Sequence, residues 1–482
     1  MNPLKKLLGQ TAVYGLSSII GRTLNYLLVP LYTSVFIAED YGVISQLYAL
    51  VAFLMVLLTF GMETSYFRFI QNSEQKASVF QNTFLTVLGL NGVFFILILF
   101  FNQQLADVLL FSDHNEYITI LTAIVCIDAI SSIPLARLRA EERAKKFAII
   151  QFTAIAVNIV LNLFFLLVLF DPARAEEGIL FILFANLISS LVRPIMLYAD
   201  FLNIQWKFDW KLGVEMFRYA FPIIIAGFAF IVNETIDRIM LKQMLTDLPN
   251  VTNRMADFQI GVYSACYKLA MLVTILLQAY RYAAEPFFFS QSNNQDRNKL
   301  YVKLMNYFVA TVCLVFLGVS LNLDIFRHFI SNETYWVGLK VVPILLLANV
   351  FLGIYLNQSI WYKLSNQTKF GAYISIIGAA LTIGINYVFI PKYGYMASAW
   401  ATLIAYGMMM VISYLLGQRH FPIKYNLRKF FVYLGTALLL FFIAKSVGFE
   451  SGSLLKLLFN NMLIFLFIAL VVFVEGIRFR KV

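Results

Sequence analysis

Charged residues are scarce in this sequence. Asp, Glu, Lys and Arg account for 13% of the 482 residues, whereas 61% are hydrophobic. A typical soluble domain is about half apolar and roughly one quarter charged. The mean hydropathy of +0.78 is correspondingly high. The chain has too few charges to cover a water-facing surface, which excludes a soluble globule and indicates an all-α polytopic membrane protein.

Cysteine and histidine are also rare, with three of each. The cysteines lie inside apolar runs and have neither disulfide-framework nor metal-ligand spacing. The histidines are in expected loops and have no ligand spacing. The sequence also lacks a phosphate-binding glycine loop, a nucleophile elbow and a soluble carboxylate pair. We therefore expect no metal, no cofactor and no catalysis. The three cysteines are Cys126, Cys266 and Cys313, and the three histidines are His114, His328 and His420.

A membrane-spanning helix needs about 20 mostly apolar residues. This criterion predicts fourteen spans with short loops between them. The first follows Lys5 and Lys6 and is too long for a signal peptide, so we expect it to be retained. The predicted spans are 9–33, 43–66, 78–101, 117–136, 147–170, 177–199, 216–238, 258–280, 300–322, 339–362, 370–390, 395–417, 427–447 and 455–476.

Acidic residues are outnumbered, and the formal net charge is +11. Such an excess can indicate nucleic-acid binding, but here the basic residues follow the loops. With the N-terminus in the cytoplasm, 26 Lys and Arg fall on the inner side and nine on the outer side, leaving Arg22 and Lys268 within the membrane. This distribution predicts cytoplasmic termini. It gives no reason to expect a nucleic-acid partner.

Two halves of the chain resemble each other. Residues 41–45, YGVIS, open the second span, and residues 260–264, IGVYS, open the eighth. Further matches keep their order and spacing across six spans, so we predict two six-helix lobes in a parallel repeat. The N-lobe is 1–200, an interfacial aromatic linker is 201–215, the C-lobe is 216–418, and two further helices occupy 419–482.

Two cations lie near the middle of apolar spans. A central arginine costs about 2.5–3.5 kcal/mol on insertion scales, so such a side chain usually faces a partner or a water-filled cavity. Arg22 and Lys268 in a shared cavity would attract pyrophosphate or acidic sugars. Asn25 lies on the same helix face as Arg22. The alternative is local pairing, with Asp128 neutralising Arg22 and with Glu234 and Asp237 neutralising Lys268.

The seventh span also carries carboxylates. Glu234 and Asp237 are candidates for binding a proton or a cation that drives transport. Asn386 and Thr402 would supply further oxygens for a hard cation such as sodium. The alternative interpretation is a charge cluster at the outer headgroups.

The sequence resembles the polysaccharide flippases of the multidrug/oligosaccharidyl-lipid/polysaccharide exporter superfamily. The resemblance is carried by GLSSIIGRTLNYLLVPLYTSVF in the first span, EDYGVISQLYALVAFLMVLLTFGMETSYFRF through the second, FRYAFPIIIAGFAFIVNETIDRIML in the seventh and IGVYSACYKLAMLV in the eighth. It implies two six-helix bundles around a cationic cavity and alternating access.

The same resemblance implies a substrate and a location. A polyprenyl-pyrophosphate-linked oligosaccharide, such as an O-antigen repeat unit of lipopolysaccharide, would move from the inner to the outer leaflet of a bacterial inner membrane. The expected partners are this lipid-linked sugar, membrane lipids and other membrane proteins of polysaccharide assembly. A lipid II-type peptidoglycan-precursor flippase and a cation-coupled multidrug exporter of the same fold remain alternatives. A glycan-assembly enzyme is disfavoured because the expected outer loops are short.

Overall fold

A computed structural model describes residue 24 and residues 26–72, 76–172, 174–202, 206–290, 296–365, 367–450 and 452–476. Its elements are α2 (Leu28–Val35), α3 (Ala38–Thr59), α4 (Met62–Asn72), α5 (Lys76–Val108), α6 (Asn115–Ala140), α7 (Ala144–Phe164) and the π-helical turn η1 (Phe165–Leu169), then α8 (Ala175–Met196), α9 (Tyr198–Leu202), α10 (Trp210–Thr246), α11 (Asn253–Ser290), α12 (Arg297–Leu321) and α13 (Leu323–Phe326), then the 3-10 helices η2 (Arg327–Phe329) and η3 (Glu333–Val341), and finally α14 (Val342–Gln358), α15 (Ile360–Leu364), α16 (Lys369–Tyr393), α17 (Tyr395–His420), α18 (Leu427–Ser446) and α19 (Leu454–Glu475).

Thirteen helical segments in the described part of the chain are long and apolar enough to cross a membrane. They correspond in order to the second through fourteenth predicted spans, which confirms the all-α polytopic fold class. Most of the first predicted span, 9–33, lies outside the described residues.

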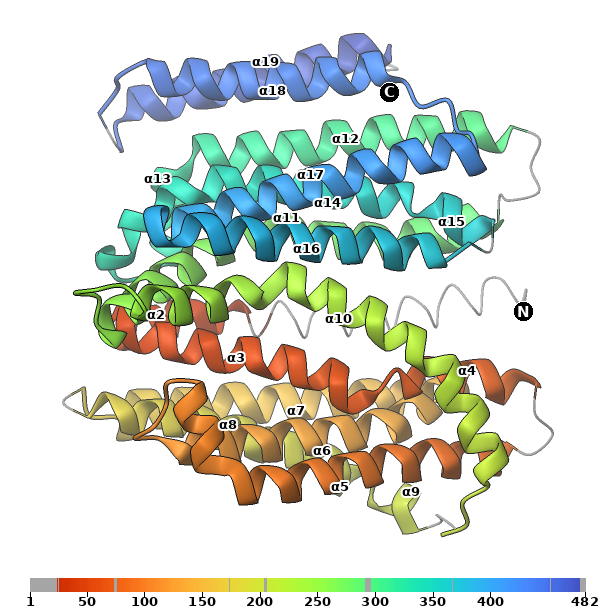
Figure 1. Cartoon of the computed structure of the whole chain (residues 1–482). Helices are drawn as coiled ribbons and strands as arrows, with labels where there is room; N and C mark the ends of the chain where they lie inside the picture. The colour runs from red at the N-terminus through yellow and green to blue at the C-terminus, as the bar shows by residue number, and fades with distance from the viewer. Residues whose placement is uncertain are drawn as a thin grey trace. The chain divides into compact units, whose positions relative to one another are not determined.

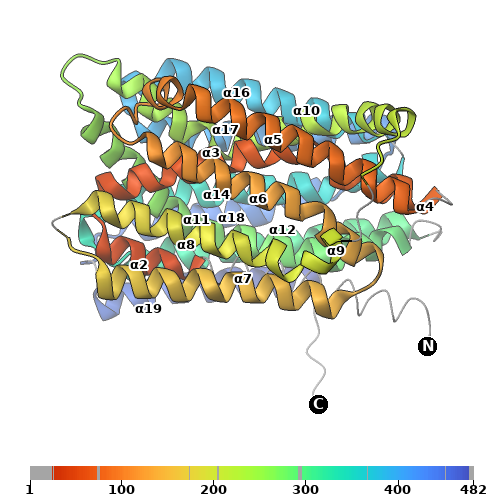
Figure 2. The same cartoon turned by 90° about the horizontal axis from the view of Figure 1, so that it is seen from below.

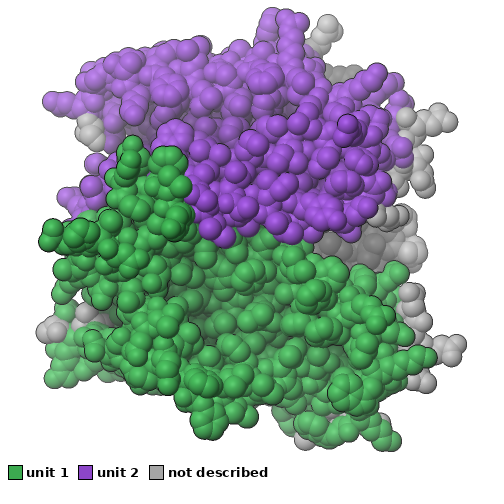
Figure 3. Space-filling model, viewed as in Figure 1, with its two compact units in different colours: residues 1–261, 386–394 green, residues 262–385, 395–482 purple. Residues whose placement is uncertain are grey.

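The chain divides into two compact units, coloured separately in Figure 3. Unit 1 contains residues 1–261 and 386–394, and unit 2 contains residues 262–385 and 395–482. These bounds differ from those of the predicted lobes, because unit 1 includes α10 and the start of α11. The division by compactness does not test the repeat, so the lobes remain a prediction.

Within unit 1, α6 is flanked by α5 and α8, and α7 packs on α8 (Figures 1 and 2). Where α6 ends and α7 begins, buried Leu138 and Ile150 pack with Leu197, which follows α8. On the other side, α3 packs along α10 (Figure 1). The apolar composition of these helices permits such packing, and their interhelical polar contacts hold them in register.

Within unit 2, α14 packs against α17 and α12, and α12 in turn carries α18 and α19. Trp361 in α15 is almost fully buried, and its indole nitrogen donates to the Ser413 hydroxyl of α17 at 3.3 Å. The last two helices are tied together where the Tyr433 hydroxyl donates to Glu475 at 2.5 Å. Asn460 of α19 donates to the Leu321 carbonyl of α12 at 2.5 Å.

Several helices are longer than the apolar runs predict. The expected ranges 216–238 and 258–280 extend to Trp210–Thr246 in α10 and Asn253–Ser290 in α11. The Asp209 side chain caps α10 by accepting from the backbone N–H groups of Lys211 and Leu212. Polar residues in these extra turns form side-chain pairs, so the helix continues where hydrophobicity alone suggests an end. Much of the expected loops 241–258 and 323–338 is consequently helical.

The second predicted span, 43–66, is interrupted. Phe60 and Gly61 both have positive φ, at 51° and 61°, and separate α3 from α4. A Cβ on Gly61 would lie 3.2 Å from the Ala220 carbonyl of α10. This break therefore combines a left-handed backbone with a tight helix contact, and both favour glycine.

We predict that Gly61→Ala lowers the free energy of unfolding by about 1–2 kcal/mol, because alanine is strained at positive φ. Thermal unfolding in detergent micelles measures this change. The control is Gly92→Ala in α5, where no atom lies within 4 Å of an added Cβ. Equal stability of the Gly61 and Gly92 variants would contradict the prediction.

Candidate functional site

The two best sequence candidates for binding the substrate, Arg22 and Asn25, lie outside the described residues. The other cation, Lys268, is half-buried on α11 in unit 2. The substrate-binding roles of Arg22 and Lys268 therefore remain predictions.

Three of the four predicted coupling residues are buried, with Asp237 and Thr402 each 3% exposed and Asn386 fully buried, whereas Glu234 is partly exposed. The guanidinium of Arg238 donates to the Asp237 carboxylate at 2.8 Å and to the Glu234 carbonyl at 2.7 Å. Arg238 therefore joins these two α10 residues, and the Asp237 charge is compensated within its own helix. The Thr402 hydroxyl donates to the Ser398 carbonyl one turn earlier in α17, at 2.9 Å.

Unit 1 contains a polar cavity of about 160 Å³ between α3, α6, α7 and α8. Its volume exceeds the roughly 10–15 Å³ needed for one water. Isoleucine and leucine side chains form part of the wall. The polar residues that line it are Tyr48, Asp128, Asn158, Asn186, Ser189, Ser190 and Arg193.

An ion pair lies on one side of this cavity. The Arg193 guanidinium of α8 donates to the Asp128 carboxylate of α6 at 2.6 Å. It also donates to the Gln151 side-chain oxygen of α7 at 3.2 Å. Because both charged side chains keep about one quarter or less of their surface exposed, pairing offsets much of their desolvation cost.

This pairing changes the sequence interpretation of Asp128. The carboxylate was a candidate partner for Arg22, whereas in the structure it bonds Arg193. Arg193 lies near the end of the sixth predicted span, 177–199. Three helices meet at the pair, and sequence spacing alone does not identify which faces meet.

A chain of amides and phenols continues the polar network. The Tyr32 hydroxyl of α2 donates to the Asn162 oxygen at 2.9 Å. Asn158 donates to the Asn186 oxygen at 3.0 Å, and the Asn186 amide donates to the Tyr48 hydroxyl at 2.9 Å. Each bond joins different helices, as hydrogen bonds of polar side chains within apolar spans commonly do.

The unit 1 cavity therefore presents a compensated ion pair together with amide and hydroxyl groups. Such a lining supplies both donors and acceptors without a large net charge. It suits water or a neutral, hydroxyl-rich group better than an isolated anion.

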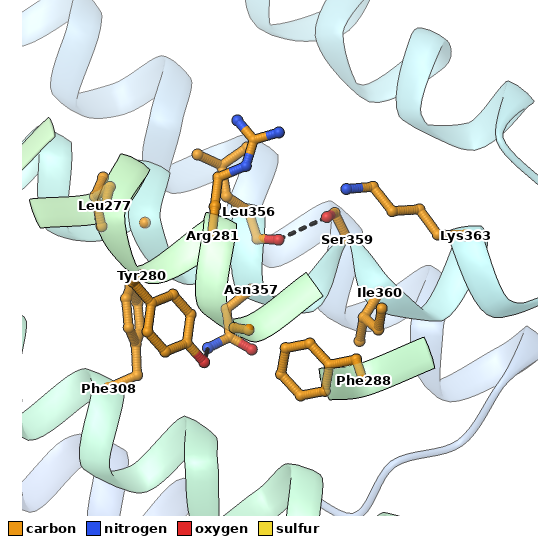
Figure 4. A pocket seen from close by; sticks show the side chains of 12 residues that line it. Leu277, Tyr280, Arg281, Phe288, Phe308, Leu356, Asn357, Ser359, Ile360 and Lys363 are labelled. Atoms are coloured by element: carbon orange, nitrogen blue, oxygen red, sulfur yellow. Dashed lines mark hydrogen bonds between the residues drawn. The ribbon is translucent and has the colours of Figure 1, made fainter. Parts of the chain in front are cut away.

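Unit 2 contains a small basic pocket, shown in Figure 4. Arg281 of α11 and Lys363 of α15 reach the same side of this pocket (Figure 4). Below them, the Asn357 amide donates to the Tyr280 hydroxyl at 2.7 Å. The volume is about 10 Å³, so the pocket as it stands holds at most a single water.

A second cavity in unit 2 is mostly apolar and measures about 190 Å³. It lies between α12, α14, α17 and α18. Val309, Met410 and Phe430 contribute apolar surface, and Asn306 and Gln358 contribute amides. An apolar lining with a few polar groups is the usual character of a small-molecule site, and this lining is chemically compatible with a hydrocarbon chain.

Unit 1 contains a further buried ion pair that was not predicted from the sequence. Lys242 of α10 pairs with Asp257 of α11 at 2.7 Å, and Gln46 of α3 donates to the same carboxylate at 2.6 Å. The available signal was the position of Gln46 directly after the repeated YGVIS motif. Lys242 and Asp257 had been placed in or beside an outer loop.

Apolar helices of spanning length, with ion pairs and amide networks held between them, define an integral membrane protein. A sequence model of the family described as polysaccharide biosynthesis protein matches residues 7–292, more than half of the chain. The chain belongs to this polysaccharide biosynthesis family. No curated protein sequence matches it.

Solved structures confirm the fold. The lipid II flippase MurJ, in an inward closed conformation, is similar with a TM-score of 0.73 and 14% identity, over 95% of this chain and 98% of that one. An inward-facing multidrug resistance MATE family transporter of the MOP superfamily has a TM-score of 0.64 and 15% identity, over 82% and 94% of the two chains. At these identities the similarity establishes the flippase-type transporter fold alone.

The Asp128–Arg193 pair predicts strongly coupled mutations. Asp128→Leu or Arg193→Met alone leaves a partly buried charge uncompensated, and each should cost about 2–4 kcal/mol of unfolding free energy. The double variant should cost much less than the sum. Unfolding in detergent micelles gives the coupling energy, and additive losses would show that the two charges do not stabilise each other.

Proposed function

We propose that this protein is a flippase that moves a polyprenyl-pyrophosphate-linked oligosaccharide, an O-antigen or related repeat unit, from the inner to the outer leaflet by alternating access. The observation that carries the proposal is membership of the polysaccharide biosynthesis family, combined with a transporter fold. On this proposal the protein is not an enzyme and resides in a bacterial inner membrane with cytoplasmic termini.

The two larger cavities support a substrate with chemically different parts. The unit 1 cavity offers hydrogen-bond donors and acceptors for sugar hydroxyls, and the unit 2 cavity offers apolar surface for a prenyl chain. Arg22, Asn25 and Lys268 are the proposed ligands of the pyrophosphate, because guanidinium and ammonium groups form charge-assisted hydrogen bonds to phosphate oxygens.

Two other substrates are compatible with the fold. The TM-score of 0.73 to a lipid II flippase favours a peptidoglycan precursor as the second candidate. A cation-coupled multidrug exporter is the third, on the similarity to a multidrug resistance transporter. Deleting the gene and identifying what accumulates separates them. A lipid-linked oligosaccharide supports the proposal, accumulated lipid II supports the second candidate, and altered drug susceptibility without either lipid supports the third.

Arg22→Ala should lower translocation at least about tenfold at matched membrane abundance, since a charge-assisted hydrogen bond contributes about 1.5–3 kcal/mol. Arg22→Lys should retain part of the activity because the charge remains. Lys268→Ala should show a similar loss. The matched control is Lys299→Ala, whose side chain is 85% exposed. Unchanged transport in both Arg22 variants would exclude the substrate-binding role of Arg22.

We also propose that Glu234, Asp237, Asn386 and Thr402 contribute to binding a coupling cation. Translocation by reconstituted protein should then fall when the sodium or the proton gradient is collapsed. Glu234→Gln should reduce that dependence, because a carboxylate that titrates or binds a cation has been removed. Transport that ignores both gradients in the unmodified protein would rule out coupling.

A further inference from the structure

The backbones of α3 and α11 touch at two glycines. A Cβ on Gly42 of α3 would lie 2.0 Å from the Asp257 carbonyl oxygen, and one on Gly261 of α11 would lie 1.7 Å from the Ala38 carbonyl oxygen. Neither position accepts a side chain without moving a backbone. Both glycines hold the second position of the repeated motif, YGVIS in one repeat and IGVYS in the other.

A buried polar triad lies one turn from this contact. The Gln46 amide of α3 donates to the Asp257 carboxylate at 2.6 Å, and Lys242 of α10 donates to the other carboxylate oxygen at 2.7 Å. Gln46 and Lys242 are each 3% exposed, and Asp257 is 7% exposed. All of these residues lie in unit 1, and α3 packs along α10 (Figure 1).

The two bonds to Asp257 are unequal in kind. Lys242 and Asp257 both follow the predicted linker and belong to the second repeat, whereas Gln46 belongs to the first. Separating Gln46 from Asp257 leaves the buried carboxylate still compensated by Lys242. Separating Lys242 from Asp257 would strand a buried charge, which is far more costly. The triad therefore has one permanent bond and one bond that can release.

We infer that the Gly42–Gly261 contact and the Gln46–Asp257 bond form the outer closure of the translocation path. This closure parts when the protein opens outward and re-forms when it opens inward, while Lys242 stays paired with Asp257. The inference rests on the proposed alternating-access function and on the predicted topology, which puts the first turns of α3 and α11 at the outer face. Gln46 and the two glycines are thus positioning residues of the cycle, without contact to substrate.

Cysteine labelling tests the closure. Ala49 lies on the same face of α3 as Gly42 and Gln46, one turn deeper, and is 3% exposed. Ala49→Cys is introduced after replacing the three native cysteines, and a membrane-impermeant maleimide is applied to intact cells or to inverted vesicles. In this background, Gln46→Ala should raise the labelling rate from outside about tenfold, the effect of losing one hydrogen bond to a charged group. Gly42→Ala should raise the same rate, because its Cβ would meet the Asp257 carbonyl oxygen.

The control is Gly89→Ala in α5, where an added Cβ meets no atom within 4 Å, and its labelling rate should stay unchanged. Gln46→Ala keeps the Lys242–Asp257 pair, so it should reach wild-type abundance even if Gly42→Ala does not fold. Labelling that stays constant, or rises only from the inner side, would overturn the inference. Reduced abundance of Gln46→Ala would overturn it as well, because the bond would then hold the fold rather than a closure.

The labelling result is independent of the substrate. If gene deletion produces no lipid-linked oligosaccharide while Gln46→Ala raises outer labelling, the closure stands and the proposed substrate fails. If the oligosaccharide accumulates while labelling is unchanged in both variants, the function stands and the closure fails.

Discussion

The constraint on which this structure depends is the cost of holding a charge away from water. An isolated ionised group in a low-dielectric interior costs several kcal/mol, and pairing offsets that cost only with good geometry. Three carboxylates of unit 1 meet a cation at 2.6–2.8 Å, in the pairs Asp128–Arg193, Asp237–Arg238 and Asp257–Lys242. The first and third of these pairs join different helices and so decide which helix faces can meet.

The three pairs differ in the number of helices that they connect. Asp237 and Arg238 are neighbours on α10, so their bond lies within one helix. Asp128 and Arg193 tie α6 to α8, and Gln151 adds α7. Asp257 is held by α10 and α3 together with its own helix. Polar pairing thus converts a set of apolar helices, which lipid would accept in many arrangements, into a specific bundle.

The sequence alone was sufficient for the elements that depend on hydrophobicity. Runs of about 20 apolar residues located the thirteen spans in the described part of the chain. Asparagines within apolar spans favour hydrogen bonds between helices, and Asn158 and Asn186 form one. These features are local. An apolar run indicates a span, and an amide within that run indicates a hydrogen bond, before the partner is known.

The sequence was insufficient where the answer depends on a partner. Asp128 was one alternative partner for Arg22 in the sequence, whereas the structure shows its bond to Arg193 of α8. The end of α10 was placed too early and the start of α11 too late, since Lys242 and Asp257 look like loop residues until they are seen to pair. A charged residue in an apolar protein reports that a partner exists, and the three-dimensional packing identifies the partner.

The cost of burying charge also bears on the polar cavity and on the Gln46–Asp257–Lys242 triad, both of which lie in unit 1. Where pairing is complete and helices pack closely, as at Gly42 and Gly261, the interior excludes water. Where amides and hydroxyls line a space, as beside Asp128, water or a hydroxyl-rich group can occupy it. A transporter needs both kinds of interior, because it must hold a polar cargo while keeping the membrane sealed. A closure that releases through Gln46, a neutral amide, meets both needs, since no buried charge loses its counter-ion when the path opens.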